Sequence, residues 1–147
     1  MRKSLVFFGL VAAVACSLAQ AETKKLQLIS ITGPEQLSDM GEKGDSPGDI
    51  LTFTSTIKDA KGEATLGEDH GYCFRISPAA HTWECAFSVV LKGGSINAAG
   101  TDNDAGDSTY AVVGGTGIYH SAHGVLKVHP HDPKVESKVF TLTIELE

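Results

Sequence analysis

Residues 71–90 read GYCFRISPAAHTWECAFSVV, and this stretch decides the fold that we expect. Two runs rich in aromatic and β-branched residues flank Pro78-Ala79-Ala80, which suits a turn. A hairpin centred on Ala79 places Cys73 opposite Cys85, and directly opposed residues lie close enough for a disulfide. The stretch therefore predicts an antiparallel hairpin closed by a Cys73–Cys85 disulfide.

The same register places Arg75 opposite Trp83 and Ser77 opposite His81, on the face that carries the cysteines. The second strand has a clean apolar face, made of Trp83, Cys85, Phe87 and Val89. The apolar side chains of the first strand alternate out of phase with that face, and they are Tyr72, Phe74 and Ile76. Two alternatives follow: a bulge switches the parity, or these three side chains face outward and cover a subunit interface of a dimer or trimer.

Outward from this hairpin, short strands and small turns recur along the chain, and helical spacing is missing after residue 21. Asp59-Ala60-Lys61-Gly62 and Gly93-Gly94 are typical hairpin turns, while residues 33–48 and 101–108 have the composition of solvated loops. The strands that we expect are Lys25–Thr32, Asp49–Lys58, Tyr72–Ser77, Thr82–Leu91, Ser95–Ala99, Tyr110–Val113, Val125–His129 and Val135–Glu145. Such a chain folds as an antiparallel sandwich or barrel.

The N-terminus has the layout of a secretory signal peptide. A basic start at Arg2 and Lys3 precedes the apolar run Leu5–Ala15, and Ala19-Gln20-Ala21 is a small-x-small cleavage site. We therefore expect a signal peptide over residues 1–21, one domain over 22–147, and a secreted or periplasmic protein. Cleavage before Cys16, which would produce a lipoprotein, is the alternative. No later segment approaches the about 20 apolar residues of a membrane span.

Charge and cysteine content narrow the partners and the compartment. The chain has 18 Asp and Glu against 12 Lys and Arg, for a formal net charge of −6, and it has no basic cluster. This balance argues against nucleic acid or an anionic membrane as a partner. Cys73 and Cys85 are the two cysteines that remain after residue 21, and an even count in an exported domain fits one disulfide.

Several segments, in the right order, resemble the allene oxide cyclase/dirigent superfamily over about Leu26–Leu146. The most specific is YAVVGGTGIY at residues 110–119, followed by Gly124. The others are GDILTF at 48–53, GYC at 71–73 and WECAFS at 83–88. The resemblance implies an all-β protein, an eight-stranded antiparallel β-barrel with a hydrophobic cavity, often trimeric in plant members.

The glycines of the most specific segment fit a tight turn. Gly114, Gly115 and Gly117, with Thr116 between them, allow the backbone to end a strand sharply and tuck against the barrel. A phosphate-binding loop does not fit, because no Gly-Lys-Ser/Thr follows. Nothing else in the sequence points to a cofactor, and we expect none.

The resemblance carries over the apolar cavity walls of the plant cyclases but not their polar groups. Phe53, Trp83 and Cys73 match cavity positions of that family. Ser30 stands where those cyclases have a Glu, while Thr32 and Ser55 stand where they have Asn. A Ser cannot replace a carboxylate in stabilising developing positive charge. We therefore do not expect this chain to catalyse allene oxide cyclisation.

Other polar residues have a structural and a functional interpretation. Asp49, the one acid at a family motif position, is either a strand-start residue that binds nearby amides or a pocket residue. Imidazoles and carboxylates can bind Zn²⁺ or Cu²⁺, but His120 with His123, and His129 with His131, fit exposed loops better, so we expect no metal site. The predicted site therefore does not include the four histidines or Asp49.

Arg75 is the one Arg after residue 21. Facing inward, it would stack on Trp83 and bind a ligand carboxylate through two hydrogen bonds; facing outward, it would pair with Glu84 or another surface acid. The predicted cavity residues are Ser30, Leu51, Phe53, Ser55, Arg75, Trp83 and Phe87. We expect a barrel that binds or steers a small hydrophobic molecule, with two alternatives: an isomerase or cyclase that confines a reactive substrate, and a structural protein with a filled barrel.

Overall fold

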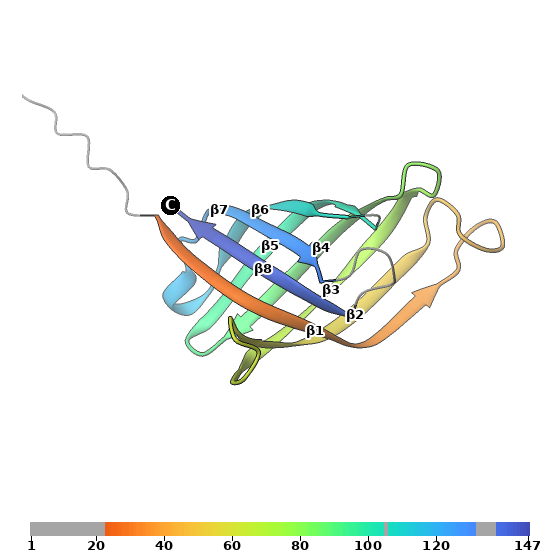
Figure 1. The fold of residues 1–147 in the computed structure, drawn as a ribbon. Helices are drawn as coiled ribbons and strands as arrows, with labels where there is room; N and C mark the ends of the chain where they lie inside the picture. The colour runs from red at the N-terminus through yellow and green to blue at the C-terminus, as the bar shows by residue number, and fades with distance from the viewer. Residues whose placement is uncertain (1–22, 105, 132–137) are drawn as a thin grey trace, which may run out of the picture.

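Eight antiparallel strands form a closed barrel in the computed structural model, which describes residues 23–104, 106–131 and 138–147 (Figure 1). The strands are β1 Lys24–Ser38, β2 Ile50–Asp59, β3 Thr65–Ser77, β4 Thr82–Leu91, β5 Gly94–Asn103, β6 Ser108–Gly115, β7 Gly124–Pro130 and β8 Val139–Leu146. Each strand pairs with its neighbours in sequence, and β8 pairs with β1 to close the sheet. The predicted eight-stranded antiparallel barrel is confirmed.

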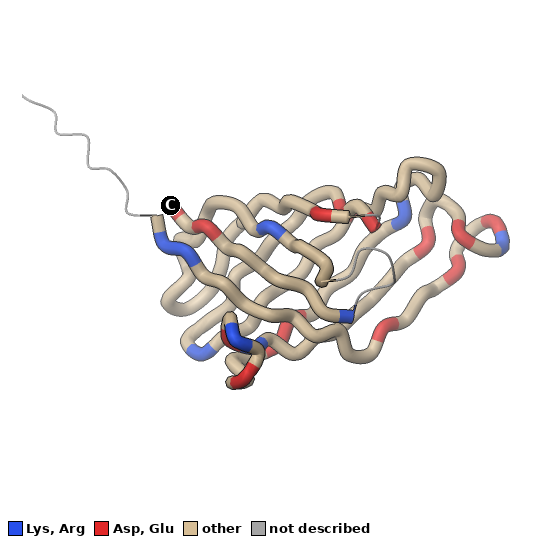
Figure 2. Tube along the Cα trace, in the orientation of Figure 1, with Lys and Arg blue, Asp and Glu red and all other residues tan. Residues whose placement is uncertain are grey.

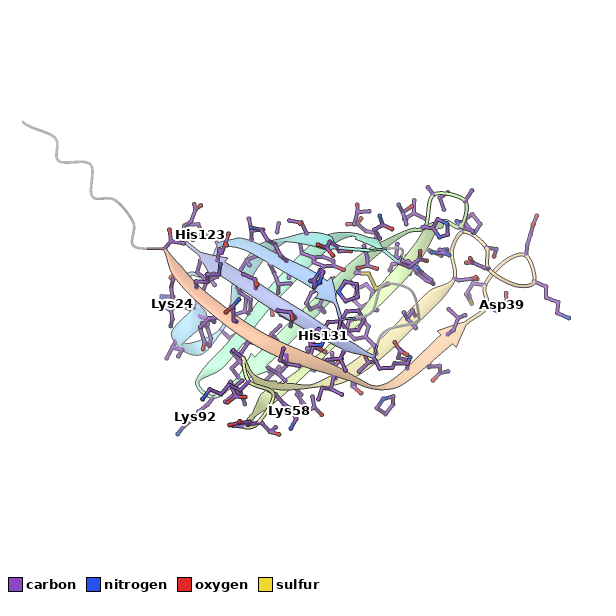
Figure 3. The ribbon with its side chains drawn as sticks, in the orientation of Figure 1. Lys24, Asp39, Lys58, Lys92, His123 and His131 are labelled. Carbon is purple, nitrogen blue, oxygen red and sulfur yellow. A yellow bond between two sulfur atoms is a disulfide. The ribbon has the colours of Figure 1, made fainter. Side chains whose placement is uncertain are left out.

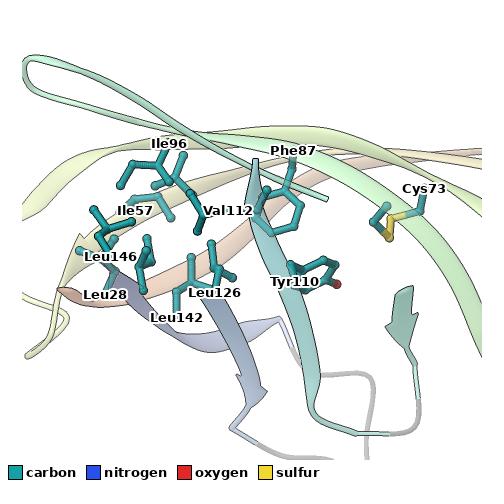
Figure 4. Packing of buried hydrophobic residues seen from close by; sticks show 14 residues of the cluster. Leu28, Ile57, Cys73, Phe87, Ile96, Tyr110, Val112, Leu126, Leu142 and Leu146 are labelled. Carbon is teal, nitrogen blue, oxygen red and sulfur yellow. A yellow bond between two sulfur atoms is a disulfide. The ribbon is translucent and has the colours of Figure 1, made fainter. Parts of the chain in front are cut away.

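One half of the barrel interior is filled by aliphatic side chains. Alternate residues of each strand point inward, and the inward residues near the start of β1 and the end of β2 meet those of the other strands there (Figure 4). The side chains that are less than 2% exposed include Ile57, Val89, Ile96, Leu126 and Ile144. This half of the interior is therefore the hydrophobic core of the barrel.

The hairpin of β3 and β4 has the predicted disulfide and most of the predicted register. Cys73 lies opposite Cys85 with their Cα atoms 4.0 Å apart, and Arg75 lies opposite Trp83. The register then shifts, so Ser77 pairs with Thr82 and not with His81 as the sequence predicted. The reason is local: His81 adopts a left-handed conformation (φ 57°) and belongs to the turn.

The out-of-phase residues of β3 face outward. Tyr72, Phe74 and Ile76 are 47%, 41% and 54% exposed, because the register shift lies beyond Arg75 and does not bring them inside. The out-of-phase alternation of β3 is therefore explained by outward-facing side chains and not by a bulge. That these side chains cover a subunit interface stays a prediction from the sequence.

Three strands extend furthest beyond their predicted ranges. β1 continues to Ser38 where the sequence predicted a loop from residue 33, β3 begins at Thr65 and not at Tyr72, and β5 runs to Asn103 through part of the predicted loop at 101–108. Their Gly, Asp and Glu residues disfavour strands locally, but pairing with a neighbouring strand overrides that preference, and the start of β3 pairs on both sides. The signal peptide at 1–21, and residues 135–137 of the predicted last strand, lie outside the described residues.

The chain turns sharply between β6 and β7. β6 ends at Gly115, and the 3₁₀ helix η1, Gly117–Tyr119, follows Thr116. A Cβ atom on Gly115 would lie 2.3 Å from the carbonyl oxygen of Tyr119 and 2.5 Å from that of Ser95. Gly117 has a φ of 59°, and its Cβ would overlap the carbonyl oxygen of Gly93 at 1.9 Å. Close backbone contact, therefore, requires glycine at both positions.

We expect Gly115→Ala to destabilise the barrel by about 1–3 kcal/mol, because the added methyl group forces backbone apart. Chemical denaturation followed by circular dichroism measures the change. Gly106→Ala is the control, since a Cβ there meets no atom within 4 Å. Equal stability of the two variants would show that the turn tolerates a side chain.

Candidate functional site

The second half of the barrel contains a cavity of about 150 Å³. It lies at the end where β1, β3 and β5 finish and β2, β4 and β6 begin, so the loops at 39–49, 78–81 and 104–107 belong to the same end (Figure 1). The lining residues come from all eight strands, and they are Ser30, Thr32, Glu35, Leu51, Phe53, Ser55, Asp69, Cys73, Cys85, Phe87, Asp102, Tyr110, Val128, Phe140 and Leu142. The barrel is thus packed at one end and hollow at the other.

Five of the seven predicted cavity residues line this space. They are Ser30, Leu51, Phe53, Ser55 and Phe87. Aromatic rings form much of the wall: the ring of Phe87 is 6.1 Å from that of Phe53 and meets the ring of Tyr110 edge-on at 5.0 Å, measured between centroids. Whether these residues contact a ligand stays a prediction.

A buried carboxylate, Asp69 of β3, lies among these walls at 4% exposure. The hydroxyl of Ser30 donates to its Oδ2 at 3.0 Å, and the hydroxyl of Ser55, directly across the β2–β3 ladder, also hydrogen-bonds the carboxylate. Ser30, the position at which the resemblance implied a Glu in the plant cyclases, is thus a hydrogen-bond partner of a carboxylate from β3.

The environment of Asp69 disfavours its charge. Burial raises the pKa of Asp69, and the hydrogen bonds from Ser55 and Ser30 and the nearby charge of His70 only partly offset that effect. Its Oδ1 atom is buried and has no hydrogen-bond partner among the described residues. A buried carboxylate oxygen without a partner is costly to a fold.

Two further acids line the cavity, and each has a partner. The phenol of Tyr110 donates to Oδ1 of Asp102, and burial together with the negative charge of Asp102 raises the pKa of Tyr110. Glu35, near the end of β1, forms an ion pair with Lys138. Along the same end of the barrel, Asp and Glu outnumber Lys and Arg in Figure 2.

Sequence reasoning missed Glu35 and Asp102 because they fell in expected loops, and Asp69 because it lay before the predicted start of its strand at Tyr72. A signal was nevertheless present for Asp69. Its number has the same parity as Cys73 and Arg75, so a strand extended backward from Tyr72 would have placed it on the inward face. The predicted strand began too late, at Tyr72, because Gly71 and the polar residues before it interrupt the apolar alternation.

Arg75 is buried at 6% exposure and stacks on Trp83, with its guanidinium carbon 4.6 Å from the ring centroid. Neither residue lines the cavity, which departs from the predicted cavity set. Protein carboxylates supply the anion: Asp45 accepts two hydrogen bonds, at 2.7 and 2.6 Å, and Asp104 accepts a third. Both acids come from loops and not from strands, so the protein supplies the partner that the sequence had assigned either to a ligand carboxylate or to a surface acid such as Glu84.

The Arg75 cluster joins three loops at the hollow end of the barrel. Asp45 belongs to the loop at 39–49 and Asp104 to the loop at 104–107, while His81, in the β3–β4 turn, lies 3.0 Å from Asp104 through its Nδ1. Burial opposes ionisation of Asp104, but hydrogen bonds from Arg75 and Trp83 prevail and lower its pKa. The cluster therefore clamps the loops around the mouth of the barrel.

Asp49 supports the same loop from within. It is 1% exposed, and its carboxylate accepts hydrogen bonds from the backbone N–H groups of Met40 at 2.8 Å and Ser46 at 2.9 Å. These two bonds lower the pKa of Asp49. These contacts agree with the structural interpretation of Asp49, in which a residue at the start of a strand binds nearby backbone amides.

The histidines lie on the outside of the barrel, where Figure 3 labels His123 and His131. His129 pairs with Asp107 at 2.7 Å, and His131 lies 2.9 Å from the hydroxyl of Thr141. Within the described ranges, no three His, Cys, Asp or Glu side chains are grouped as metal ligands would be. Likewise, the part of the chain that the structure describes has no helix long and apolar enough to cross a membrane.

The structure is a closed antiparallel barrel with one packed half and one half that contains a cavity. The family model of dirigent-like proteins matches residues 8–147, and the chain belongs to this family. A comparison with curated proteins finds no match.

Solved structures with the same fold have varied functions. A pyocyanin demethylase is 24% identical with a TM-score of 0.72, over 84% of this chain and 100% of that chain. A pterocarpan synthase dirigent protein is 14% identical with a TM-score of 0.71, over 85% and 84%. An exo-specific intermolecular Diels-Alderase is 16% identical with a TM-score of 0.65, over 86% and 98%. At these identities the likeness shows the fold.

We expect Arg75→Ala to lower the stability of the protein by about 1–3 kcal/mol, because it removes the shared partner of Asp45 and Asp104 and the ring contact with Trp83. Thermal and denaturant unfolding measure the effect. Lys43→Ala, at an exposed position of the loop at 39–49, is the matched control. If the two variants are equally stable, the cluster does not clamp the loops.

Proposed function

We propose that this protein binds a small, mostly apolar molecule in the hollow half of its barrel and holds it in one orientation. The observation that carries this proposal is the cavity itself, in which buried Asp69 leaves one oxygen without a partner among aromatic and aliphatic walls. A barrel built for structure alone would fill this half with side chains, as it fills the other half. A few polar groups in an apolar cavity are typical of ligand sites.

The family supports a steering role. Similar solved structures include a pterocarpan synthase dirigent protein and an exo-specific intermolecular Diels-Alderase. Confinement in a fixed geometry lowers the entropic part of a barrier without a dedicated catalytic group. The proposal also includes export, on the strength of residues 1–21, and action outside the cytoplasm.

We expect Leu51→Trp to abolish the binding of small aromatic probes such as toluene, because the larger ring occupies the cavity that Leu51 lines. Ligand-observed NMR measures the binding, and circular dichroism checks that the variant is folded. Leu66→Trp adds the same ring at an exposed position of β3 and should leave binding unchanged. Undiminished binding to Leu51→Trp would place the site elsewhere.

A second candidate function is that of an isomerase or cyclase with Asp69 as acid or base. Burial moves the pKa of Asp69 upward, toward the range in which a carboxyl group exchanges protons efficiently near neutral pH. Ser30 and Ser55 hold the carboxylate in place, and Asp69 lines the cavity that a substrate would occupy.

We expect the Asp69 carboxyl group to titrate above its ordinary value of 3.8, as measured by ¹³C NMR with Asp69→Asn as the assignment control. Because the folded state binds this proton more tightly than the unfolded chain does, Asp69 should destabilise the fold as pH rises from 3.8 through the raised pKa. Asp69→Asn should lack that pH dependence. A midpoint at or below 3.8 would exclude the acid–base role.

A further inference from the structure

We propose that the cavity selects a small organic cation with an aromatic or other apolar skeleton, and that Asp69 holds its positive charge. This inference rests on the proposed function, because it names the chemical class of the molecule that the hollow half of the barrel binds. It replaces the ligand carboxylate that the sequence suggested.

The charge of the lining is the first argument. The ionisable residues that line the cavity are Glu35, Asp69, Asp102 and Tyr110, and none of the described lining residues is Lys, Arg or His. Glu35 pairs with Lys138, and Asp102 accepts the phenol of Tyr110. The donors to Asp69 and Asp102 are neutral hydroxyl groups, so these contacts leave both carboxylates without a cation, and Asp69 is the one of the two with a buried oxygen that has no partner among the described residues.

The geometry of Asp69 is the second argument. Ser30 and Ser55 donate to the carboxylate, while Oδ1 is buried without a partner among the described residues. In surroundings of low dielectric constant, an opposite charge stabilises an ionised carboxylate more than a neutral donor does. A cation in the cavity that Asp69 lines would therefore supply the missing charge.

The aromatic walls are the third argument. Phe53, Phe87, Tyr110 and Phe140 surround the same space. The faces of aromatic rings are negative, so they attract a cation and repel an anion. A ligand carboxylate would meet three acids and these rings, whereas Arg75, the residue expected to bind it, is occupied by Asp45 and Asp104.

The size of the cavity determines which small molecules can serve as probes in the experiment. An apolar cavity of about 150 Å³ holds a molecule the size of benzene. Toluene and N-methylpyridinium have nearly the same shape, but the second carries a permanent positive charge that does not titrate. Benzoate has a similar ring with a negative charge. The three probes separate charge from shape.

The experiment measures binding of the three probes to the full protein and to Asp69→Asn by ligand-observed NMR and calorimetry. We expect N-methylpyridinium to bind the native protein at least about 10-fold more tightly than benzoate does. Asp69→Asn should weaken N-methylpyridinium about 10-fold or more and leave toluene within about 3-fold. Glu68→Gln, which removes the same charge from the neighbouring exposed position of β3, should change neither.

The pH dependence provides a second measurement that needs no variant. Because a cation binds the ionised form of Asp69, affinity for N-methylpyridinium should rise as pH increases above 3.8 through the raised pKa of Asp69, while affinity for toluene should not. The other titratable groups nearby are Glu35, Asp102 and Tyr110 in the lining and His70 beside Asp69. Loss of the rise in Asp69→Asn assigns it to Asp69.

The outcomes separate this inference from the proposed function. If toluene binds but benzoate binds as tightly as N-methylpyridinium, or if Asp69→Asn weakens neither, the cation class is wrong and the cavity site stands. If no probe binds the native protein, the proposed function fails and the inference fails with it. Should Asp69→Asn not fold, the ranking of the probes and the pH dependence in the native protein decide.

Discussion

Closure of the sheet by pairing β8 with β1 is the constraint on which the rest of this structure depends. Once the ends meet, each strand has a partner on both sides, and every second side chain must enter the same enclosed interior. Aliphatic residues such as Ile57 and Leu126 fill that interior at one end. At the other end the inward positions hold serines, acids and rings, which do not fill the space.

The hollow end costs stability that the packed end must offset. An inward Asp69 at 4% exposure disfavours folding when it is ionised, and a cavity forfeits the contacts that a packed core would have. The disulfide between Cys73 and Cys85 and the Arg75 cluster lie at this same end. They restrain strands and loops where apolar packing is least able to do so.

Local sequence patterns predicted the structure correctly where a strand is regular and apolar on one face. The β4 range, the Cys73–Cys85 pair and the Arg75–Trp83 pair were predicted from spacing alone. The start of β3 was not, because its Gly and acidic residues have no strand preference of their own and are held by β2 and β4. This error affected the prediction of the candidate site most, because Asp69 lies in the part of β3 that was not predicted.

The sequence by itself determined the alternation of inward and outward residues, the disulfide and the family, because each depends on neighbours along one hairpin or on a short motif. Tertiary structure alone decided which inward residues meet. Asp45 and Asp104 reach Arg75 from loops about 30 residues away on either side, and Ser30 reaches Asp69 across 39 residues. Those distances in sequence carry no periodic signal, and closure of the barrel brings the groups together.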